Sequence, residues 1–295
     1  MREAAALVPT APAARSEGVH RRSWLRFVRR RTAVAGGIIT AIFILATLLG
    51  DWIRPYPPTA TDYDHTLSPP SFAHLTGTDD FGRDIFSRLI IGSRYSLGMG
   101  LVATSVGAAL GASWGISSAF YGRAFDNISM RAVDVLLAFP GILLAIAIVA
   151  ILGPGLVNVV IAVGVFGVPT FARLTRAPAL SAMAQEYIQA AHALGAGSVR
   201  IMTRHILPSV LPSILVYVSL RIGVTVLTAS ALSYLGLGVQ PPTPEWGAML
   251  ANARLFLNVA PHLVLAPGIT ISLAVLGFNL LGDGVRDALD PRLRT

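Results

Sequence analysis

The sequence contains no lysine and no cysteine, and charged residues make up only 13% of its 295 residues. Soluble domains carry charge on about a quarter of their residues, so an ordinary soluble domain is excluded. The absence of lysine excludes a P-loop, whose lysine binds the β- and γ-phosphates, and it also excludes Schiff-base chemistry. The absence of cysteine excludes disulfides, thiolate nucleophiles and cysteine-based metal sites.

Hydrophobic residues make up 54% of the chain, which indicates a membrane protein. A helix needs about 20 apolar residues to cross a hydrocarbon core of about 30 Å. Six stretches reach this length approximately: 33–53, 95–120, 132–153, 155–172, 209–232 and 260–281. The sequence therefore predicts an all-α polytopic membrane protein with six transmembrane helices. Because six is even, both termini are expected on the same side.

The distribution of arginine predicts the orientation. All 23 basic residues are arginines; eight precede the first stretch, nine more lie on the same side, five lie on the opposite side, and Arg221 lies within a stretch. Under the positive-inside rule, both termini and the segment 173–207 are cytoplasmic, and residues 1–31 form a basic cytoplasmic tail. The net charge of +8 could suggest nucleic acid. Much of it flanks the membrane spans, however, which favours the lipid bilayer as the partner.

A polar, helix-capable segment at 186–208 interrupts the apolar stretches and is expected to dock a partner. Small residues let another surface approach closely, a glycine permits a sharp bend, and a basic turn follows. These residues are Ala190, Ala191, Gly195, Arg200 and Arg204.

Two segments on the opposite side carry proline and glycine signals for turns. The first, at about 54–94, is predicted to end in a short helix over 81–90, with Thr78 or Asp79 as its cap. That helix is expected either to lie on the outer membrane surface or to dock as in a soluble protein. The second segment, 233–259, is predicted to be a structured loop with Trp246 at the membrane interface.

Several separate stretches of the chain resemble one family. They are GTDDFGRDIFSR at 77–88, the segment 186–208, LSYLGLG at 232–238 with Pro241-Pro242 and Trp246-Gly247, and GDGVRDALDP at 282–291. In this order they are similar to the dipeptide/oligopeptide/nickel ABC-importer permeases, and more narrowly to their C-type (DppC/OppC-like) subunit. The resemblance runs from about residue 22 to the end, and it implies the type I ABC-importer permease fold over residues 32–295.

The resemblance implies a non-catalytic subunit with four kinds of partner. A homologous B-type permease would complete the pathway, two cytoplasmic ABC ATPases would hold ATP and Mg, an extracytoplasmic binding protein would deliver substrate, and the bacterial inner membrane would surround the subunit. The expected substrates are di- or oligopeptides, with nickel or another small solute left open.

The segment 186–208 resembles the family's EAA loop, which sits in a cleft of the ATPase. The implied ATPase-coupling residues are Gln189, Ala190, Ala191, Leu194, Gly195, Arg200 and Arg204. At Gln189 the family motif has Glu. Glutamine keeps the ability to form hydrogen bonds but lacks the negative charge.

Arg221 is the most specific candidate for a functional residue within the predicted spans. It lies 13 positions after Pro208, and therefore about 20 Å along a helix. Charges at such depth face a cavity or a partner. Arg221 either meets substrate in the pathway or pairs with the second permease or with carbonyl groups of the bundle.

Two further interpretations, a metal site and a self-sufficient carrier, have less support from the residues. His65 and His74 have no compact cluster of ligands around them, so no metal site is predicted and solvated or capping roles are expected. A self-sufficient secondary carrier is the alternative function. Such a carrier is expected to show internal repeats and a membrane-embedded ion site, and neither is evident.

Overall fold

The computed structural model describes residue 28 and residues 30–289, so all but three residues of the predicted N-terminal tail lie outside it. Within the described residues the secondary structure is helical, apart from an isolated bridge between Thr78 and Asp84. The longer helices are α2 (Arg31–Ile53), α3 (Ile85–Tyr121), α4 (Arg123–Ala138), α5 (Gly141–Leu152), α6 (Leu156–Met183), α9 (Leu207–Tyr234) and α11 (His262–Leu289). The shorter elements are η1 (Tyr63–His65), α7 (Glu186–Ala193), α8 (Ser198–Ile201), a π-helical turn (Met202–Ile206), α10 (Trp246–Ala253) and η3 (Arg254–Phe256).

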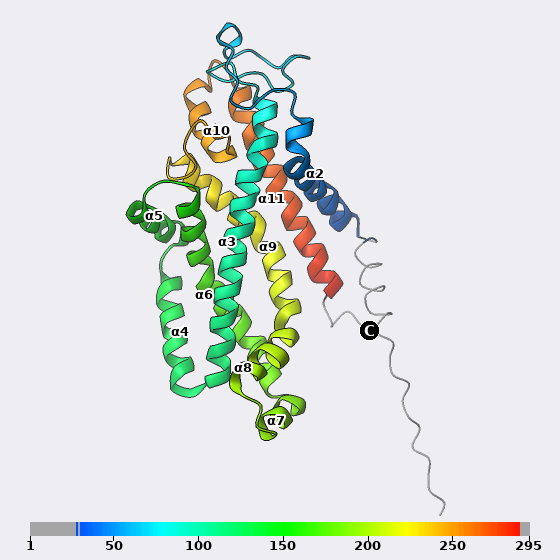
Figure 1. Cartoon of the computed structure of the whole chain (residues 1–295), viewed down its shortest axis with the longest axis vertical. Helices are drawn as coiled ribbons and strands as arrows, with labels where there is room; N and C mark the ends of the chain where they lie inside the picture. Colours follow the sequence, from blue (N-terminus) through cyan, green and yellow to red (C-terminus); the bar gives the residue numbers. More distant parts are fainter. Residues whose placement is uncertain (1–27, 29, 290–295) are drawn as a thin grey trace, which may run out of the picture.

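Figure 1 shows a long bundle with different elements at its two ends. Helices α7 and α8 form one end, and α10 with the segment 54–84 forms the other. Between them α3 packs against α6 and α9, and α11 packs against α2 and α9. Helix α9 therefore lies at the centre of the bundle and connects its two ends.

Five helical stretches of the described residues are long and apolar enough to cross a membrane, and a sixth is formed if α4 and α5 count as one bent span. The prediction of an all-α polytopic membrane protein is confirmed. The predicted span over 132–153 covers the end of α4 and all of α5, and it is bent, because these two helices meet at an angle of 89°. The break lies at Phe139 and Pro140, where the proline disfavours a helical conformation of the residue before it.

The predicted short helix over 81–90 overlaps the start of a longer helix, and of its two expected placements the docked one is found. Helix α3 runs without interruption from Ile85, and its outer turns are buried rather than laid on a membrane surface: Ile85 and Leu89 belong to a core cluster with Trp246. The N-cap is neither of the predicted residues but Asp84, whose carboxylate accepts a hydrogen bond from the backbone N–H of Ser87 at 2.8 Å. The segment before α3 therefore ends at residue 84.

A stripe of small residues brings α3 and α6 into close contact. A Cβ atom added at Gly111 would lie 2.4 Å from the carbonyl oxygen of Val168, and one at Gly115 would lie 2.3 Å from that of Ala172. By contrast, no atom lies within 4 Å of a Cβ at Gly98. Small residues allow such contact between membrane helices, where van der Waals packing drives association.

Candidate functional site

Helix α7 is held against the bundle by one side chain. Ile188 is only 4% exposed and joins a core cluster that contains Ile201 and Ile206. After α7 the chain turns at Gly195, whose φ of +80° favours glycine. The expected bend at this residue is confirmed, and it directs the chain from α7 into α8.

Most of the predicted coupling residues are exposed at the end of the bundle that α7 and α8 form. Leu194 is 88% exposed, although it is a large apolar residue. Ala191 is half-buried, while the others are exposed: Gln189, Ala190, Gly195, Arg200 and Arg204. The side-chain amide of Gln189 donates to the carbonyl oxygen of Ala184 at 3.4 Å, so it is directed toward its own chain.

Two apolar residues that the sequence reasoning did not select extend this surface. Tyr187 is 51% exposed and Val199 is 68% exposed. Together with Ala190 and Leu194 they form an area that we call the α7 surface. The sequence could have indicated these residues, because they are large and apolar within a polar segment. Only the fold, however, shows that Ile188 points inward and Tyr187 outward.

The segment after α7 is not a loop but the start of a long rod. From Ser198 to Tyr234 the chain is one continuous helical stretch that includes the π-helical turn. Arg200 and Arg204 therefore lie on the same rod as the central helix α9. Residues up to Met183 likewise belong to α6, so much of the predicted segment 173–207 consists of the ends of two long helices on either side of α7.

Ion pairs tie the neighbouring helices together near this end. Arg176 of α6 donates from Nε to the carboxylate of Asp126 of α4 at 2.6 Å, and Ser118 of α3 donates to the same oxygen at 2.6 Å. Arg173 pairs with Asp134 at a more exposed position. The sequence reasoning counted both arginines as loop charges, and it had no signal for their partners because the pairs join distant helices.

Among the described residues, the Arg221 guanidinium donates no hydrogen bond to a carbonyl group of the bundle, which was one of its expected partners. It is half-buried, and its guanidinium lies 5.2 Å from the ring centre of Phe166, which is a cation–π contact between α9 and α6. No ion pair joins it to a described residue. Its role in a pathway stays a prediction.

A polar cluster holds the segment 54–84 onto the outer end of α3. Asp79 accepts from Arg83 at 2.7 Å, and Arg88 donates to the carbonyl oxygen of Pro58 at 2.8 Å. His74 lies 2.9 Å from the capping carboxylate of Asp84. Asp79 and Arg83 are thus paired locally, and His74 supports a helix cap.

Residues Glu245 and Trp246 fasten α10 to α3. Trp246 is fully buried and donates from Nε1 to the carbonyl oxygen of Leu89 at 2.9 Å, so its predicted place at the membrane interface is wrong. Glu245 caps α10 by accepting from the N–H groups of Gly247 and Ala248. Its burial raises the pKa of its carboxyl group above the ordinary value.

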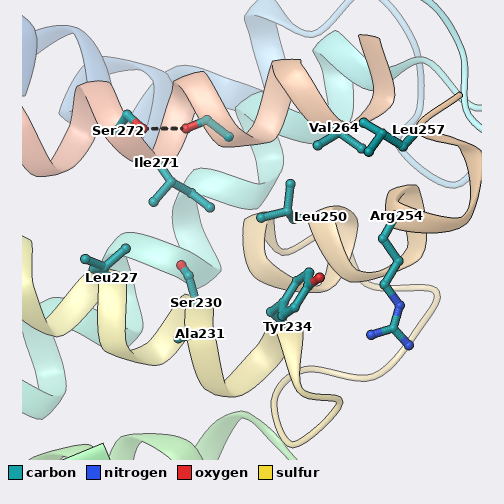
Figure 2. Close-up of a pocket in the computed structure, with 11 residues that line it drawn as sticks. Leu227, Ser230, Ala231, Tyr234, Leu250, Arg254, Leu257, Val264, Ile271 and Ser272 are labelled. Atoms are coloured by element: carbon teal, nitrogen blue, oxygen red, sulfur yellow. Dashed lines mark hydrogen bonds between the residues drawn. The ribbon is translucent and has the colours of Figure 1, made fainter. Parts of the chain in front are cut away.

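A cavity of about 500 Å³ opens between α9, α10 and α11 in the half of the bundle that carries α10. Figure 2 shows its apolar walls, formed by residues such as Leu227, Leu250 and Ile271, and Arg254 with Tyr234 at one end. The sequence reasoning did not select these residues. Their apolar character is ordinary for membrane helices, and only the separation of the three helices reveals the space.

These features define a class of protein, a polytopic helical membrane protein. Residues 107–295 match the family "Binding-protein-dependent transport system inner membrane component". Residues 20–70 match "N-terminal TM domain of oligopeptide transport permease C". The chain belongs to this family of ABC-importer permease subunits, as the resemblance predicted.

Named relatives cover nearly the whole chain. The "Glutathione transport system permease protein GsiD" of Pectobacterium atrosepticum is 47% identical over 294 residues, which are 98% of each chain. The protein of the same name from Shigella sonnei is 47% identical over 272 residues, 92% of this chain and 90% of the relative. The chain is therefore a multi-pass inner-membrane permease subunit of a family whose members are non-catalytic, and the alternative of a self-sufficient carrier is wrong.

Proposed function

We propose that this chain forms half of the translocation pathway of an ATP-driven importer for short peptides. Its permease relatives are named for the transport of glutathione, a tripeptide, and part of the chain matches an oligopeptide permease family. These similarities favour di- and tripeptides over nickel or another small solute. A homologous B-type permease forms the other half.

One observation carries the coupling part of the proposal: the continuous helical stretch from Ser198 to Tyr234. It begins beside the α7 surface and ends beside the cavity in the outer half. A displacement at α7 is therefore transmitted along one rod, because helices and packed cores move between discrete arrangements rather than deform continuously.

The α7 surface is suited to a cleft in a partner ATPase. It presents exposed Tyr187, Leu194 and Val199 around small Ala190, with Arg200 and Arg204 beside them, and apolar anchors of this kind concentrate binding energy at interfaces. The ATPases bind ATP and Mg, since this chain has no lysine for a P-loop.

The position of α7 and α10 at opposite ends of the bundle also supports one orientation of the subunit in the membrane. If α7 docks cytoplasmic ATPases, α10 and the segment 54–84 face the outside, where an extracytoplasmic binding protein delivers substrate. Both termini are then cytoplasmic, in agreement with the arginine distribution.

The test begins with affinity purification of the tagged chain from native membranes in mild detergent, followed by mass spectrometry. We expect stoichiometric recovery of a homologous permease, P-loop ATPases and a solute-binding protein. The purified assembly is then reconstituted in proteoliposomes with ATP inside. Uptake of labelled glutathione and of a labelled dipeptide, but not of free nickel, is expected to depend on the binding protein. Recovery of the chain alone, or ATP-dependent uptake of nickel without peptide uptake, contradicts the proposal.

A further inference from the structure

The cavity between α9, α10 and α11 has walls that come from three elements. Leu227 lies on α9, Leu250 on α10, and Ile271 on α11. Its volume of about 500 Å³ falls in the range of about 300 to 1,000 Å³ that is typical of small-molecule sites. A few polar groups among apolar walls are also typical of such sites, because these groups orient the ligand.

Ser230 supplies the first polar group of this cavity. Its hydroxyl oxygen is buried and has no hydrogen-bond partner among the described residues. Figure 2 shows it rising from α9 toward the space between α9 and α11. Because a buried hydroxyl without a partner costs free energy, this position favours an occupant that offers a donor or an acceptor.

Arg254 supplies a positive charge at one end of the cavity. Its guanidinium lies 5.8 Å from the ring centre of Tyr234, and both side chains line the cavity. Among the described residues no carboxylate forms an ion pair with Arg254, whereas Arg54 and Arg94 on the same side both contact Asp51. The guanidinium is therefore available to an anionic group, for which its planar fork is well suited.

We infer that this cavity is a transit site for a short peptide with a free carboxylate, and the inference rests on the proposed function. The carboxylate binds Arg254 beside Tyr234, the peptide backbone reaches Ser230, and the apolar side chains contact Leu227, Leu250 and Ile271. An all-apolar occupant such as an acyl chain leaves the Ser230 hydroxyl without a partner. The site binds weakly, because Arg254 is solvent-exposed and a transported solute must also leave.

The first experiment measures peptide import by the complete reconstituted transporter. We expect Arg254→Gln to raise the KM for a tripeptide by about tenfold, the effect of losing one charge-assisted contact. The control is Arg54→Gln, on the same side but outside the cavity, which is expected to leave KM unchanged. Because substrate capture occurs on the separate binding protein, its affinity is the same in all assays. An unchanged KM in Arg254→Gln overturns the inference.

The second experiment detects occupancy directly. The chain has no cysteine, so Leu250→Cys introduces a single thiol into the cavity wall. In nanodiscs that hold the transporter with its binding protein, we expect a methanethiosulfonate reagent to label this thiol and the tripeptide to slow labelling several-fold. The control thiol, Thr61→Cys in the exposed outer segment, is expected to be labelled at the same rate with and without peptide.

The remaining outcomes separate the other occupants. A Leu250→Cys thiol that is unreactive under all conditions means that the second permease fills the cavity. A thiol that is protected by phosphatidylglycerol and unaffected by peptide means that a lipid fills it. Either outcome overturns the inference while the proposed function stands, provided that the wild-type transporter imports peptide. Failure of wild-type import of any peptide overturns the proposed function itself.

Discussion

Gly111 of α3 lies directly against Val168 of α6, since a Cβ atom at Gly111 would come within 2.4 Å of the Val168 carbonyl oxygen. The obstacle is backbone and not the end of a flexible side chain, so it cannot move without shifting α6. The spacing of the two helices therefore depends on the absence of a side chain at this residue.

We expect Gly111→Ala to destabilise the protein by about 1 to 3 kcal/mol, which is the usual cost of overpacking a core. Gly98→Ala is the matched control on the same helix, because no atom lies within 4 Å of its Cβ position. Thermal unfolding of both variants in detergent micelles checks this. Equal midpoints for the two would show that α3 and α6 are not packed as described.

Breaking the ion pair between Asp126 and Arg176 is expected to destabilise the protein more than breaking the pair between Asp134 and Arg173. The first is more buried, with side-chain exposures of 13% and 32%, against 56% and 52% for the second. We expect Asp126→Asn to destabilise by about 1 to 2 kcal/mol, because it weakens charge-assisted bonds that are partly shielded from water.

Asp134→Asn serves as the control for this prediction, since exposed pairs contribute less than about 1 kcal/mol. Urea unfolding of both variants at low and high salt measures the two costs. If Asp134→Asn proves as costly as Asp126→Asn, burial does not set the strength of these pairs.

Glu245 predicts a specific dependence of stability on pH. It lies between the spans, and burial raises the pKa of its carboxyl group above its ordinary value of 4.5. The folded protein therefore holds this proton more tightly than the unfolded chain does. The contribution of Glu245 to stability consequently rises as pH falls through the raised pKa toward 4.5 and is lost as pH rises.

Glu245→Gln does not titrate, so subtracting its unfolding free energy from that of the wild type isolates this group. We expect the difference to shift in favour of the wild type as pH is lowered from 8 to about 5. Chemical unfolding at a series of pH values provides the measurement. A difference that is constant over this range would mean that the carboxyl group has the same pKa in both states.

The sequence predicted what depends on length and local chemistry. Apolar stretches of sufficient length correspond to α2, α6, α9 and α11. The bend at Gly195 also follows from one residue, because its positive φ is a local property. The coupling residues could be selected because the resemblance located them on a short polar helix.

The predictions from the sequence were wrong where a tertiary contact overrides the structural preference of a single residue. Trp246 favours an interface by its chemistry, but the Leu89 carbonyl oxygen, 157 positions away in sequence, accepts its N–H in the core. The presence of a proline alone also does not predict where a helix ends. Pro169 and Pro178 lie inside the continuous helix α6, whereas Pro140 marks a break and is followed by a glycine. Pairs such as Asp126 with Arg176 could not be predicted without the relative positions of α4 and α6.

Leu194 provides a test of docking that leaves folding intact. Because its side chain is 88% exposed, Leu194→Ser should change stability by no more than about 0.5 kcal/mol. We expect it to reduce recovery of the ATPases with the tagged chain by about tenfold or more, the effect of removing an apolar anchor. Leu255→Ser, 78% exposed at the opposite end, should leave ATPase recovery unchanged. Normal recovery with Leu194→Ser would exclude this residue from the interface.

Gln189 tests whether charge contributes to the same interface. Its amide makes only a 3.4 Å contact with the Ala184 carbonyl oxygen, so Gln189→Glu removes little within the chain and places a carboxylate on an exposed face. We expect ATPase affinity to rise several-fold at low ionic strength and the gain to disappear at high salt, because surface charges are screened beyond about 10 Å at 0.1 M. Gln240→Glu, at the opposite end of the bundle, is the matched charge control. Titration of the purified ATPase onto each variant in nanodiscs at two salt concentrations gives the affinities. If Gln189→Glu alters neither affinity nor import, this residue does not contribute to coupling, and apolar contacts through Leu194 carry the interface.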